Sequence, residues 1–391
     1  KKGLRSLVVL GFVSILASCG NSSDTGVVSN KGSATGSTEK MKVGLIALHD
    51  NNSTYDKNFI DAFNKACEKT GVQPVIKTNV PESDEAYTKA QDLVDEDCKF
   101  IFADSFGHEA HILRAAQENK DVQFSHATGT QAHTAKVSNF HNAFASIYEG
   151  RYLAGVAAGL KLQKMIEANP NTSKKLGYVG AWPYAEVISG FTSWYLGVRS
   201  IVSDVTMEVT AEALINRGCS LISQHADSYG APKMCEEKNV PNVTYNGSTE
   251  TECPNTYLIS SRVNWEPYFE YAIGQVKAGK AIDTDWTGEL GTDLYTGSVA
   301  LSTPGKKAAV EGTEAKLNEV AGKLRDGSLK VFDTSKFTVN GEKVTTYKAD
   351  VDDDGTYTGD TEVIKTENGI SYFAESEFRS APYFDLHIDG I

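Results

Sequence analysis

The sequence lacks the features that mark several large classes of protein. After residue 19 it contains no apolar run of the length that a bilayer-spanning helix needs, which is about 20 residues. It also has no basic excess, because 38 Lys and Arg stand against 51 Asp and Glu, for a net charge of -13. This balance argues against binding to nucleic acid or to anionic lipid, both of which require a basic face.

Common catalytic motifs are missing as well. The sequence contains no GxSxG elbow, no GxxxxGK[ST] loop and no GxGxxG after a predicted strand. His126 and His225 could serve as acid–base groups, yet no Ser or Cys nucleophile stands out as a partner for either. We therefore expect a protein that binds its ligand, is not an enzyme and needs no cofactor.

Cysteine spacing does not indicate a zinc site, since the sequence has no CxxC pair and its histidines form no HExxH or HxxxH motif. Cys67, Cys98 and Cys219 lie among apolar residues and are predicted to be buried thiols. Cys235 and Cys253 bracket a loop-rich stretch. Whether they form a disulfide is left undecided, because sequence alone cannot fix the pairing of cysteines.

One acidic stretch resembles half of a calcium loop. Asp350, Asp352 and Asp354 supply oxygens at positions 1, 3 and 5, and Gly355 stands at position 6. Position 12 is Thr361 in place of the usual Glu, and no flanking helix is apparent. We interpret the stretch as a solvated acidic turn, with weak calcium binding as the alternative, and expect no metal site elsewhere.

The first nineteen residues have the pattern of a secretory signal. Basic residues precede an apolar run over residues 7–17, and small residues follow just before Cys19. This end resembles the lipobox of bacterial lipoproteins, in which the cysteine is lipidated. An ordinary signal peptide is the alternative. Residues 20–40 are rich in Ser, Gly, Thr and Asn, which predicts a flexible tether between a lipid anchor at the cell membrane and a folded, extracytoplasmic protein.

The remaining chain of about 350 residues exceeds the usual size of a single core, so we expect two lobes. Short apolar runs alternate with helical periodicity, which predicts βαβ units around parallel sheets and an α/β fold. The pattern restarts at a long helix over 147–164 whose small residues suit close packing on a sheet or at a lobe junction. A further helix is predicted over 210–217. The predicted strands lie at residues 42–48, 74–79, 99–103, 122–125, 176–180 and 220–223.

Aromatic and hydrogen-bonding residues follow nearly every predicted strand. In open α/β sheets, ligands bind outside the carboxyl ends of the strands, and such a mixture suits a small-molecule cleft. The alternative is that these loops are merely polar and that some of the rings only pack. The candidate ligand-binding residues from these strand ends are Tyr55, Asp56, Phe59, Ser105, Phe106, His126, Trp182, His225, Asp227 and Asn246.

Several of these segments together resemble the basic membrane protein (Bmp) family of ABC-transporter solute-binding lipoproteins, which includes purine nucleoside and nucleobase binders. The similarity runs from about Lys42 to Gly305 and resumes at the C-terminus. Its markers are Phe102-Ala-Asp-Ser-Phe-Gly107, Phe124-Ser-His-Ala-Thr-Gly129, Tyr148-Glu-Gly-Arg-Tyr-Leu-Ala-Gly155, Gly177-Tyr-Val-Gly180, Ser223-Gln-His-Ala-Asp-Ser228 and Trp265-Glu-Pro-Tyr268.

The resemblance implies the type I periplasmic-binding fold, with two Rossmann-like lobes, a hinge and a ligand cleft between them. Lobe one would hold residues 41–145 and about 262–292, and lobe two residues 146–261 and about 293–391. Crossovers would lie near 139–148, 260–265 and 291–295. The C-terminal stretch from 330 alternates apolar and polar residues, which predicts β-hairpins packed on a lobe, with turns at Asn340-Gly341 and Asp354-Gly355.

The resemblance also assigns roles in the cleft. Phe106 and Trp182 would stack on a base, and Asp56 and Phe59 fall where the family carries an Asp-x-Ser-Phe element, although Asn58 replaces the Ser. The remaining candidates are polar residues that suit a purine or ribose, namely Asp227, Asn142 and Asn246, together with Trp265.

The expected function is capture of a purine nucleoside or nucleobase and its delivery to an ABC permease by a monomeric, membrane-anchored lipoprotein. The alternatives are a sugar or another small polar metabolite on the same fold, and a surface nucleoside hydrolase. One departure from the family bears on the ligand. About fifteen residues that normally border the cleft are missing after Val209, where Thr210 to Leu214 follow at once.

Overall fold

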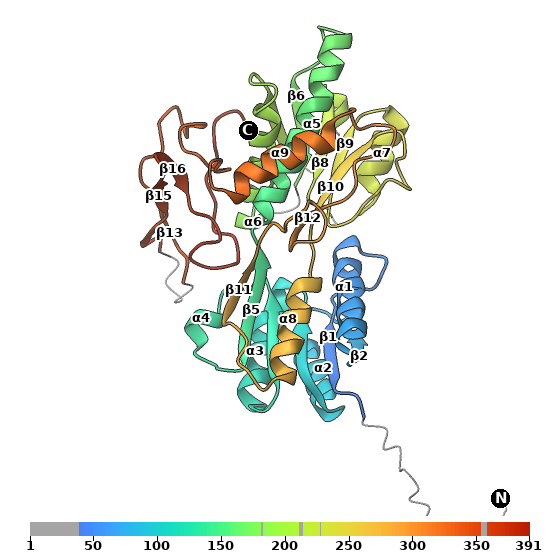
Figure 1. Ribbon diagram of the computed structural model, residues 1–391, viewed down its shortest axis with the longest axis vertical. Helices are drawn as coiled ribbons and strands as arrows, with labels where there is room; N and C mark the ends of the chain where they lie inside the picture. Colours follow the sequence, from blue (N-terminus) through green and yellow to red (C-terminus); the bar gives the residue numbers. More distant parts are fainter. Residues whose placement is uncertain (1–38, 181–182, 211–213, 227, 353–357) are drawn as a thin grey trace, which may run out of the picture. The chain divides into compact units, whose positions relative to one another are not determined.

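The computed structural model describes residues 39–391, apart from 181–182, 211–213, 227 and 353–357. Within residues 40–391, two six-stranded sheets each form the centre of a lobe (Figure 1). The predicted alternation of strands and helices around largely parallel sheets is confirmed. The predicted lipidation site, Cys19, lies outside the described residues.

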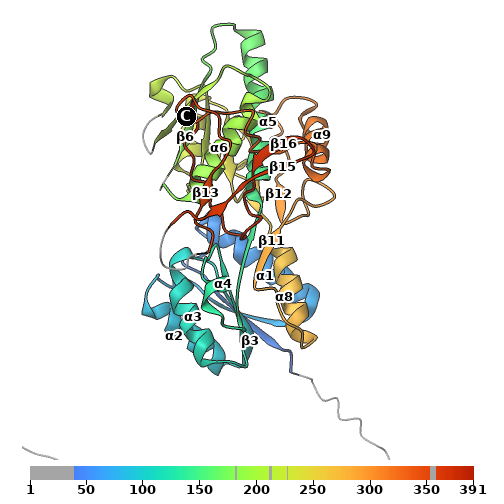
Figure 2. The same ribbon diagram turned by 90° about the vertical axis from the view of Figure 1, so that its left-hand side faces the viewer.

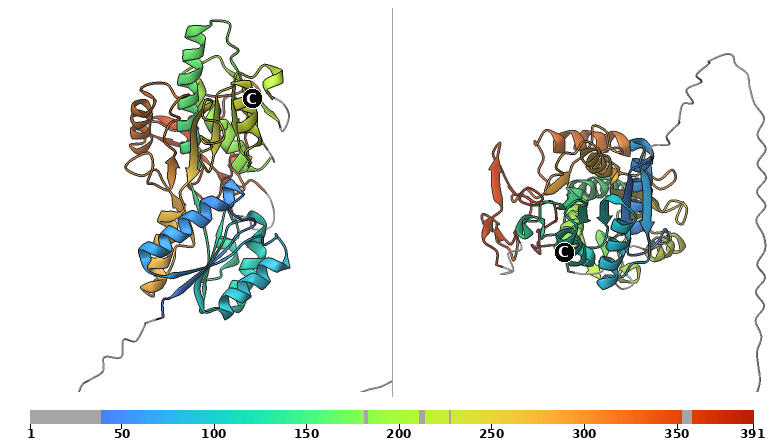
Figure 3. Two further views of the ribbon diagram at one scale, coloured as in Figure 1. Left: turned by 90° about the vertical axis from the view of Figure 1, so that its right-hand side faces the viewer. Right: turned by 90° about the horizontal axis from the view of Figure 1, so that it is seen from below.

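Lobe one has a fully parallel sheet with the strand order β11-β5-β4-β3-β1-β2. Its elements are β1 (Lys42–Ile46), α1 (Thr54–Thr70), β2 (Gln73–Lys77), α2 (Asp84–Asp95), β3 (Cys98–Ala103), η1 (Phe106–His108), α3 (Glu109–Glu118), β4 (Gln123–Ala127), α4 (Ala132–Ala135), β5 (Phe140–Ala145), α8 (Glu266–Lys277) and β11 (Asp285–Gly288). Helices α1 and α8 cover one face of the sheet, and α2 and α3 cover the other (Figure 3, left).

Helix α1 shows how local sequence shapes the edge of this lobe. The Ser53 hydroxyl caps the helix by accepting a hydrogen bond from the Asp56 N–H, and Gly71 ends it with a φ of 70°. Phe59 and Phe63 stand one turn apart and are completely buried against the sheet. The opposite, polar side of α1 is therefore left to face solvent and lobe two.

Lobe two repeats the arrangement with the strand order β12-β10-β9-β8-β6-β7, in which only β12 is antiparallel. Its elements are α5 (Ile147–Ala168), β6 (Lys175–Val179), α6 (Ala185–Arg199), β7 (Thr206–Thr210), η2 (Leu214–Arg217), β8 (Leu221–Gln224), α7 (Gly230–Lys238), β9 (Asn242–Tyr245), β10 (Tyr257–Val263), β12 (Val299–Leu301) and α9 (Thr313–Arg325).

The small residues of α5 allow it to pack closely against α6. A Cβ atom added at Gly155 would overlap the carbonyl oxygen of Trp194, and one at Gly197 would overlap the carbonyl oxygen of Tyr152. The two backbones therefore touch at a glycine pair. The small residues of α5 were expected to pack closely on a sheet or at a lobe junction. The close packing is present, but it lies between α5 and α6, two helices of lobe two.

The chain passes between the two sheets at three places. It leaves β5 for α5 at Ser146, leaves β10 for α8 at residues 264–265, and leaves β11 for β12 through residues 289–298. These connections form the junction of the lobes, at the side of the sheets where the candidate site lies.

The helix predicted over 210–217 is wrong. Thr210 ends β7, which pairs in parallel with β6, and only Leu214–Arg217 form a short 3-10 helix. Residues 211–220 are the whole connection from β7 to β8, whereas the equivalent connection in lobe one includes the twelve-residue helix α2. A parallel crossover with a helix usually takes a dozen residues or more, so this connection lies at the lower limit and leaves no room for a helix as long as α2.

The segment after α9 is held in the core of lobe two. It contains β13 (Lys348–Ala349), β14 (Thr361–Glu362), β15 (Ile364–Glu367) and β16 (Ile370–Phe373), and β15 and β16 form the expected hairpin. Phe332 stacks on Phe384 at 4.1 Å between ring centroids, and both lie in the core shared with α5 and α6. Asn340-Gly341 is a turn with positive φ at both residues, as predicted, whereas Asp354-Gly355 lies outside the described residues.

The five cysteines among the described residues are all free thiols. Cys67, Cys98 and Cys219 are buried thiols, as predicted, and Cys235 and Cys253 are also buried and unbridged, so the disulfide left open by the sequence is not formed. Among the described residues, no helix has both the length and the apolar character needed to cross a bilayer.

Candidate ligand-binding site

The lobe-one side of the site is built on two buried acids, Asp56 in the first turn of α1 and Asp104 directly after β3. Asp56 is fully buried, and its carboxylate accepts from the His49 N–H at 2.7 Å and lies 3.2 Å from His49 Nδ1. Asp104 accepts from the Leu48 N–H at 3.1 Å. Burial, together with the nearby charge of Asp56, raises the pKa of Asp104 well above its usual range. The pair fixes the two loops without facing solvent.

The loop after β3 is positioned by a residue that the sequence did not single out. Glu82 accepts from the Ser105 hydroxyl at 2.5 Å and from the Gly107 N–H at 2.8 Å. His126 lies behind this loop, with Nε2 2.6 Å from the Ser105 carbonyl oxygen, and burial lowers the pKa of His126 to about 4. Ser105 and His126 therefore support the loop, and the ring of Phe106 projects from it.

Phe106 faces an aromatic residue of the other lobe. Its side chain is 56% exposed, and Tyr184, which precedes α6, is 58% exposed. The ring centroids lie 6.1 Å apart with the planes tilted by 31°. Because exposed large aromatic side chains on both walls of an interlobe space suit a flat ligand, this pair is the strongest candidate for a ligand contact in the site.

Polar groups of lobe two lie around His225, at the end of β8. Its ring is 4.8 Å from that of Tyr245, its Nδ1 is 3.4 Å from the Tyr178 hydroxyl, and its Nε2 is 3.5 Å from Glu186. Beneath them lies Arg151, which is 1% exposed, with its guanidinium 4.6 Å from the Tyr245 ring. Burial lowers the pKa of Arg151 to about 10, so it remains a cation.

Tyr55 joins the site from lobe one. It is partly buried, and its hydroxyl donates to the Asp104 carbonyl oxygen at 2.6 Å. Its ring meets Phe59 edge-on, with the centroids 5.0 Å apart. Tyr55 therefore connects the aromatic core of lobe one to the loop that carries Phe106.

Three other residues predicted for the site lie inside lobe one. Phe59 stacks on Trp265 at 4.5 Å between centroids, and both rings are buried between α1, α8 and the sheet. Asn142 is 1% exposed, and its amide is fully used by Gly129, Asp285 and Ser380. These side chains support the fold because they occupy the core-facing positions of their elements. Trp182 and Asp227 lie outside the described residues.

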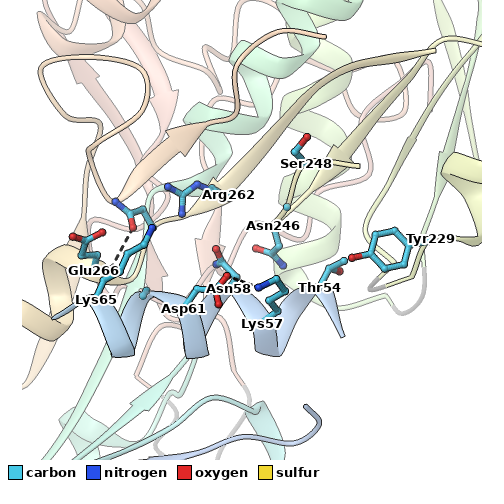
Figure 4. A pocket seen from close by; sticks show the side chains of 13 residues that line it. Thr54, Lys57, Asn58, Asp61, Lys65, Tyr229, Asn246, Ser248, Arg262 and Glu266 are labelled. Carbon is cyan, nitrogen blue, oxygen red and sulfur yellow. Dashed lines mark hydrogen bonds and ion pairs between the residues drawn. The ribbon is translucent and has the colours of Figure 1, made fainter. Parts of the chain in front are cut away.

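A cavity of about 300 Å³ lies between the polar side of α1 and the ends of β9 and β10 (Figure 4). Asn246 lines it, and the remaining lining residues were not predicted from the sequence. They are Thr54, Lys57, Asn58, Asp61, Ala62, Lys65, Tyr229, Gly247, Ser248, Arg262, Asn264 and Glu266. The helical spacing of Lys57, Asp61 and Lys65 was the available signal, because residues four apart share one face of a helix.

The described residues contain no group of three or more His, Cys, Asp or Glu side chains placed to hold a metal ion. Asp350 and Asp352 are among these residues, and Asp354 is not. The calcium alternative for this stretch therefore gains no support from the part of the chain that can be described.

Comparisons with known proteins agree with this architecture. Residues 44–324 match the Bmp family model, described as "ABC transporter substrate-binding protein PnrA-like". A purine-binding protein of Brucella abortus is 29% identical over 342 residues, which cover 80% of this chain and 91% of the relative. A putative ABC transporter glucose-binding protein of Haloferax volcanii is 30% identical over 207 residues, covering 49% of this chain and 50% of the relative.

Among solved structures, an ABC transporter solute-binding protein of Aeropyrum pernix superimposes with a TM-score of 0.60 at 16% identity, covering 75% of this chain and 93% of the other. At that identity the likeness concerns the fold, and it confirms the predicted type I periplasmic-binding architecture. The matched family consists of substrate-binding proteins, and its model spans most of both lobes. The chain therefore belongs to the Bmp family of PnrA-like ABC-transporter substrate-binding proteins.

Proposed function

We propose that this protein captures a purine nucleoside or nucleobase between its lobes and delivers it to an ABC permease. The exposed pair Phe106 and Tyr184 carries the proposal. A base held between two rings would gain stacking energy of about 1–3 kcal/mol for each ring, the range found for bases on aromatic side chains. A modest movement of either lobe would open enough space for a base between them, since stacked planes lie about 3.5 Å apart.

The surrounding polar groups suit the edge of a base or a ribose. His225 offers a ring nitrogen, Glu186 accepts hydrogen bonds, and the Tyr245 hydroxyl lies 3.4 Å from Glu186. A purine presents both donors and acceptors around its ring, so a site with both types can fix its orientation. The name of the Brucella abortus relative adds support for a purine.

The second candidate ligand is a sugar. The Haloferax volcanii relative is named as a glucose-binding protein, although it matches only half of each chain. Aromatic rings stack on a pyranose as well as on a base, so Phe106 and Tyr184 alone do not separate the two ligand classes. Direct binding measurements separate them.

The proposal includes a location. The sequence pattern of residues 1–19 supports lipidation at Cys19, and residues 20–40 would then tether the folded lobes at the extracytoplasmic face of the cell membrane. A tether of this kind raises the concentration of the protein near its permease without inserting a helix. Incorporation of labelled fatty acid into the wild type and its loss in Cys19→Ser test the anchor separately from the ligand.

Isothermal titration of the purified protein with adenine, adenosine, guanosine, inosine and glucose tests the ligand. We expect saturable binding of at least one purine and no binding of glucose. Native mass spectrometry of the protein as isolated provides an independent test, because a retained purine would appear as a defined mass increment. Binding of glucose with no heat from any purine would refute the purine assignment and support the sugar.

A further inference from the structure

The cavity between α1 and lobe two carries more positive than negative charge. Lys57, Lys65 and Arg262 line it, against Asp61 and Glu266. Both carboxylates already have partners, since Asp61 accepts from Lys57 at 2.7 Å and Glu266 is ion-paired with Lys69, which lies outside the cavity. Two cations of the cavity, Lys65 and Arg262, are therefore left without a paired carboxylate among the described residues.

Arg262 is the more informative of the two cations. It lies on β10 at the lobe junction and is half-buried, and no hydrogen bond or ion pair joins its guanidinium to another residue in the described part of the chain. Desolvation lowers the pKa of Arg262. The negative charges of Glu266 and Asp61 act in the opposite direction, and neither carboxylate is hydrogen-bonded to the guanidinium. A desolvated guanidinium with free donors is a favourable partner for a phosphate or carboxylate group.

Asn246 provides a second, independent observation. It is only 4% exposed, and its Nδ2 donates to no acceptor within the described residues. Its backbone is fixed by a hydrogen bond from its N–H to the Ser261 carbonyl oxygen at 2.8 Å and has a φ of 65°. Figure 4 shows its amide directed from lobe two toward α1, into the cavity. An unpaired buried amide costs roughly 1–3 kcal/mol, which a bound acceptor would recover.

The cavity adjoins the proposed purine site. Thr54 and Asn246 line the cavity, and their chain neighbours Tyr55 and Tyr245 belong to the candidate site. A solute with its base between Phe106 and Tyr184 could therefore extend a substituent along α1. The volume of about 300 Å³ accommodates a group of the size of a phosphate.

We propose that this cavity is an anion subsite, formed by Arg262, Lys65 and Asn246, which binds the phosphate of a purine nucleoside monophosphate. The assignment rests on the proposed purine capture and extends the substrate class from nucleosides to nucleotides. The guanidinium and the ammonium would neutralise the phosphate charge, and the Asn246 amide would donate to a phosphate or ribose oxygen. Lys57 would remain paired with Asp61.

Isothermal titration with adenosine and adenosine 5′-monophosphate, at low and at moderate salt, tests the subsite. We expect the monophosphate to bind wild type at least tenfold more tightly than adenosine, with an advantage that falls as salt rises. Arg262→Gln should reduce that advantage to less than threefold. Lys65→Gln, which alters an exposed side chain and so does not threaten folding, should reduce it partially.

Arg114→Gln is the matched control, because Arg114 is an exposed cation of lobe one that lies over the Tyr87 ring, away from the cavity. It should keep the full preference for the monophosphate. Equal affinity for the two ligands, or a preference that survives in both cavity variants, would overturn the anion subsite and leave purine capture intact. Failure of both ligands to bind, in a protein shown to be folded by circular dichroism, would overturn the subsite for adenine nucleotides. If adenine, guanosine and inosine also failed to bind, the proposed function would be overturned with it.

Discussion

Ser380, in the C-terminal segment that follows α9, donates two hydrogen bonds to Asp285 of lobe one. Its N–H donates to one oxygen of the Asp285 carboxylate at 2.7 Å, and its hydroxyl donates to the other. Asn142 and His133 donate to the same carboxylate, at 2.9 and 3.1 Å. The flanking parts of the segment are packed into lobe two, through Phe373 and Phe384 among others, and Figure 2 shows this segment, coloured red, lying along lobe two. Ser380 therefore joins the two lobes in addition to the three crossovers.

Removing the Ser380 hydroxyl should destabilise the protein measurably. Ser380→Ala deletes a donor to a buried charged acceptor and leaves the amide of Asn142 with one acceptor fewer. Hydrogen bonds to charged groups contribute about 1.5–3 kcal/mol, so we expect a loss of that size in the free energy of unfolding from urea titration. Ser335→Ala, at an exposed serine of the same segment, should change it by less than about 0.5 kcal/mol. Equal effects of the two variants would show that the Ser380–Asp285 bond contributes nothing to stability.

The glycine pair between α5 and α6 gives a second stability prediction. Gly155→Ala or Gly197→Ala would force the helices apart, because the added methyl group meets backbone atoms that cannot rotate away. We expect a loss of about 1–3 kcal/mol or more in thermal or urea unfolding. Gly322→Ala, within α9 where the methyl group meets nothing within 4 Å, should instead stabilise by about 0.5–1 kcal/mol. A tolerated alanine at Gly155 would contradict the backbone contact.

Because a buried carboxyl group of the C-terminal segment has a raised pKa, we expect the stability of the protein to depend on pH. Glu375 is 2% exposed and accepts from the Ser189 hydroxyl at 2.8 Å. Desolvation, assisted by the nearby charges of Glu186 and Glu149, raises the pKa of Glu375 to about 8. The folded state therefore holds a proton that the unfolded chain releases near pH 4.5. The protonated carboxyl group of Glu375 therefore contributes to the free energy of unfolding. This contribution is complete below about pH 4.5 and is lost as the pH rises through about 8.

Glu375→Gln should remove this dependence, since the amide keeps the hydrogen bond from Ser189 and does not ionise. The stability of the variant relative to wild type is expected to rise with pH between about 5 and 8, by up to about 1.4 kcal/mol per pH unit. Urea titrations at several pH values measure the slope, and Glu377→Gln, at an exposed carboxyl two residues away, is the matched control. Parallel pH profiles for wild type and Glu375→Gln would show that Glu375 is ionised in the folded protein at neutral pH.

Much of the fold follows from hydrophobic pattern, and the exceptions have clear physical reasons. Buried strands such as β1 and β3 are continuous apolar runs, and helices such as α1 carry apolar residues every three to four positions. The Thr210–Arg217 stretch also has helical composition. There, parallel pairing of β7 with β6 and the short distance along the chain to β8 override the local preference.

The candidate site was less predictable, because strand ends identify loops and do not say which way side chains point. Phe106 and Phe59 looked alike in sequence, yet one is exposed at the interlobe space and the other is stacked on Trp265 in the core. Tyr184 and Arg262 carried no motif. They join the candidate site only because the folded chain brings the start of α6 and the end of β10 to face residues that lie far away in the sequence.

The aromatic pair gives the most direct prediction for binding. If Phe106 and Tyr184 both contact the base, then Phe106→Ala and Tyr184→Ala should each weaken binding of the best purine ligand by roughly 5- to 150-fold, matching about 1–3 kcal/mol of stacking energy. Tyr184→Phe should bind almost as wild type, because it keeps the ring and loses only the hydroxyl. Met234→Ala removes another exposed apolar side chain, one on α7 of lobe two, and should leave affinity unchanged. An affinity that depends on only one of the two rings would mean that the ligand lies against a single lobe, so lobe closure would contribute little to its capture.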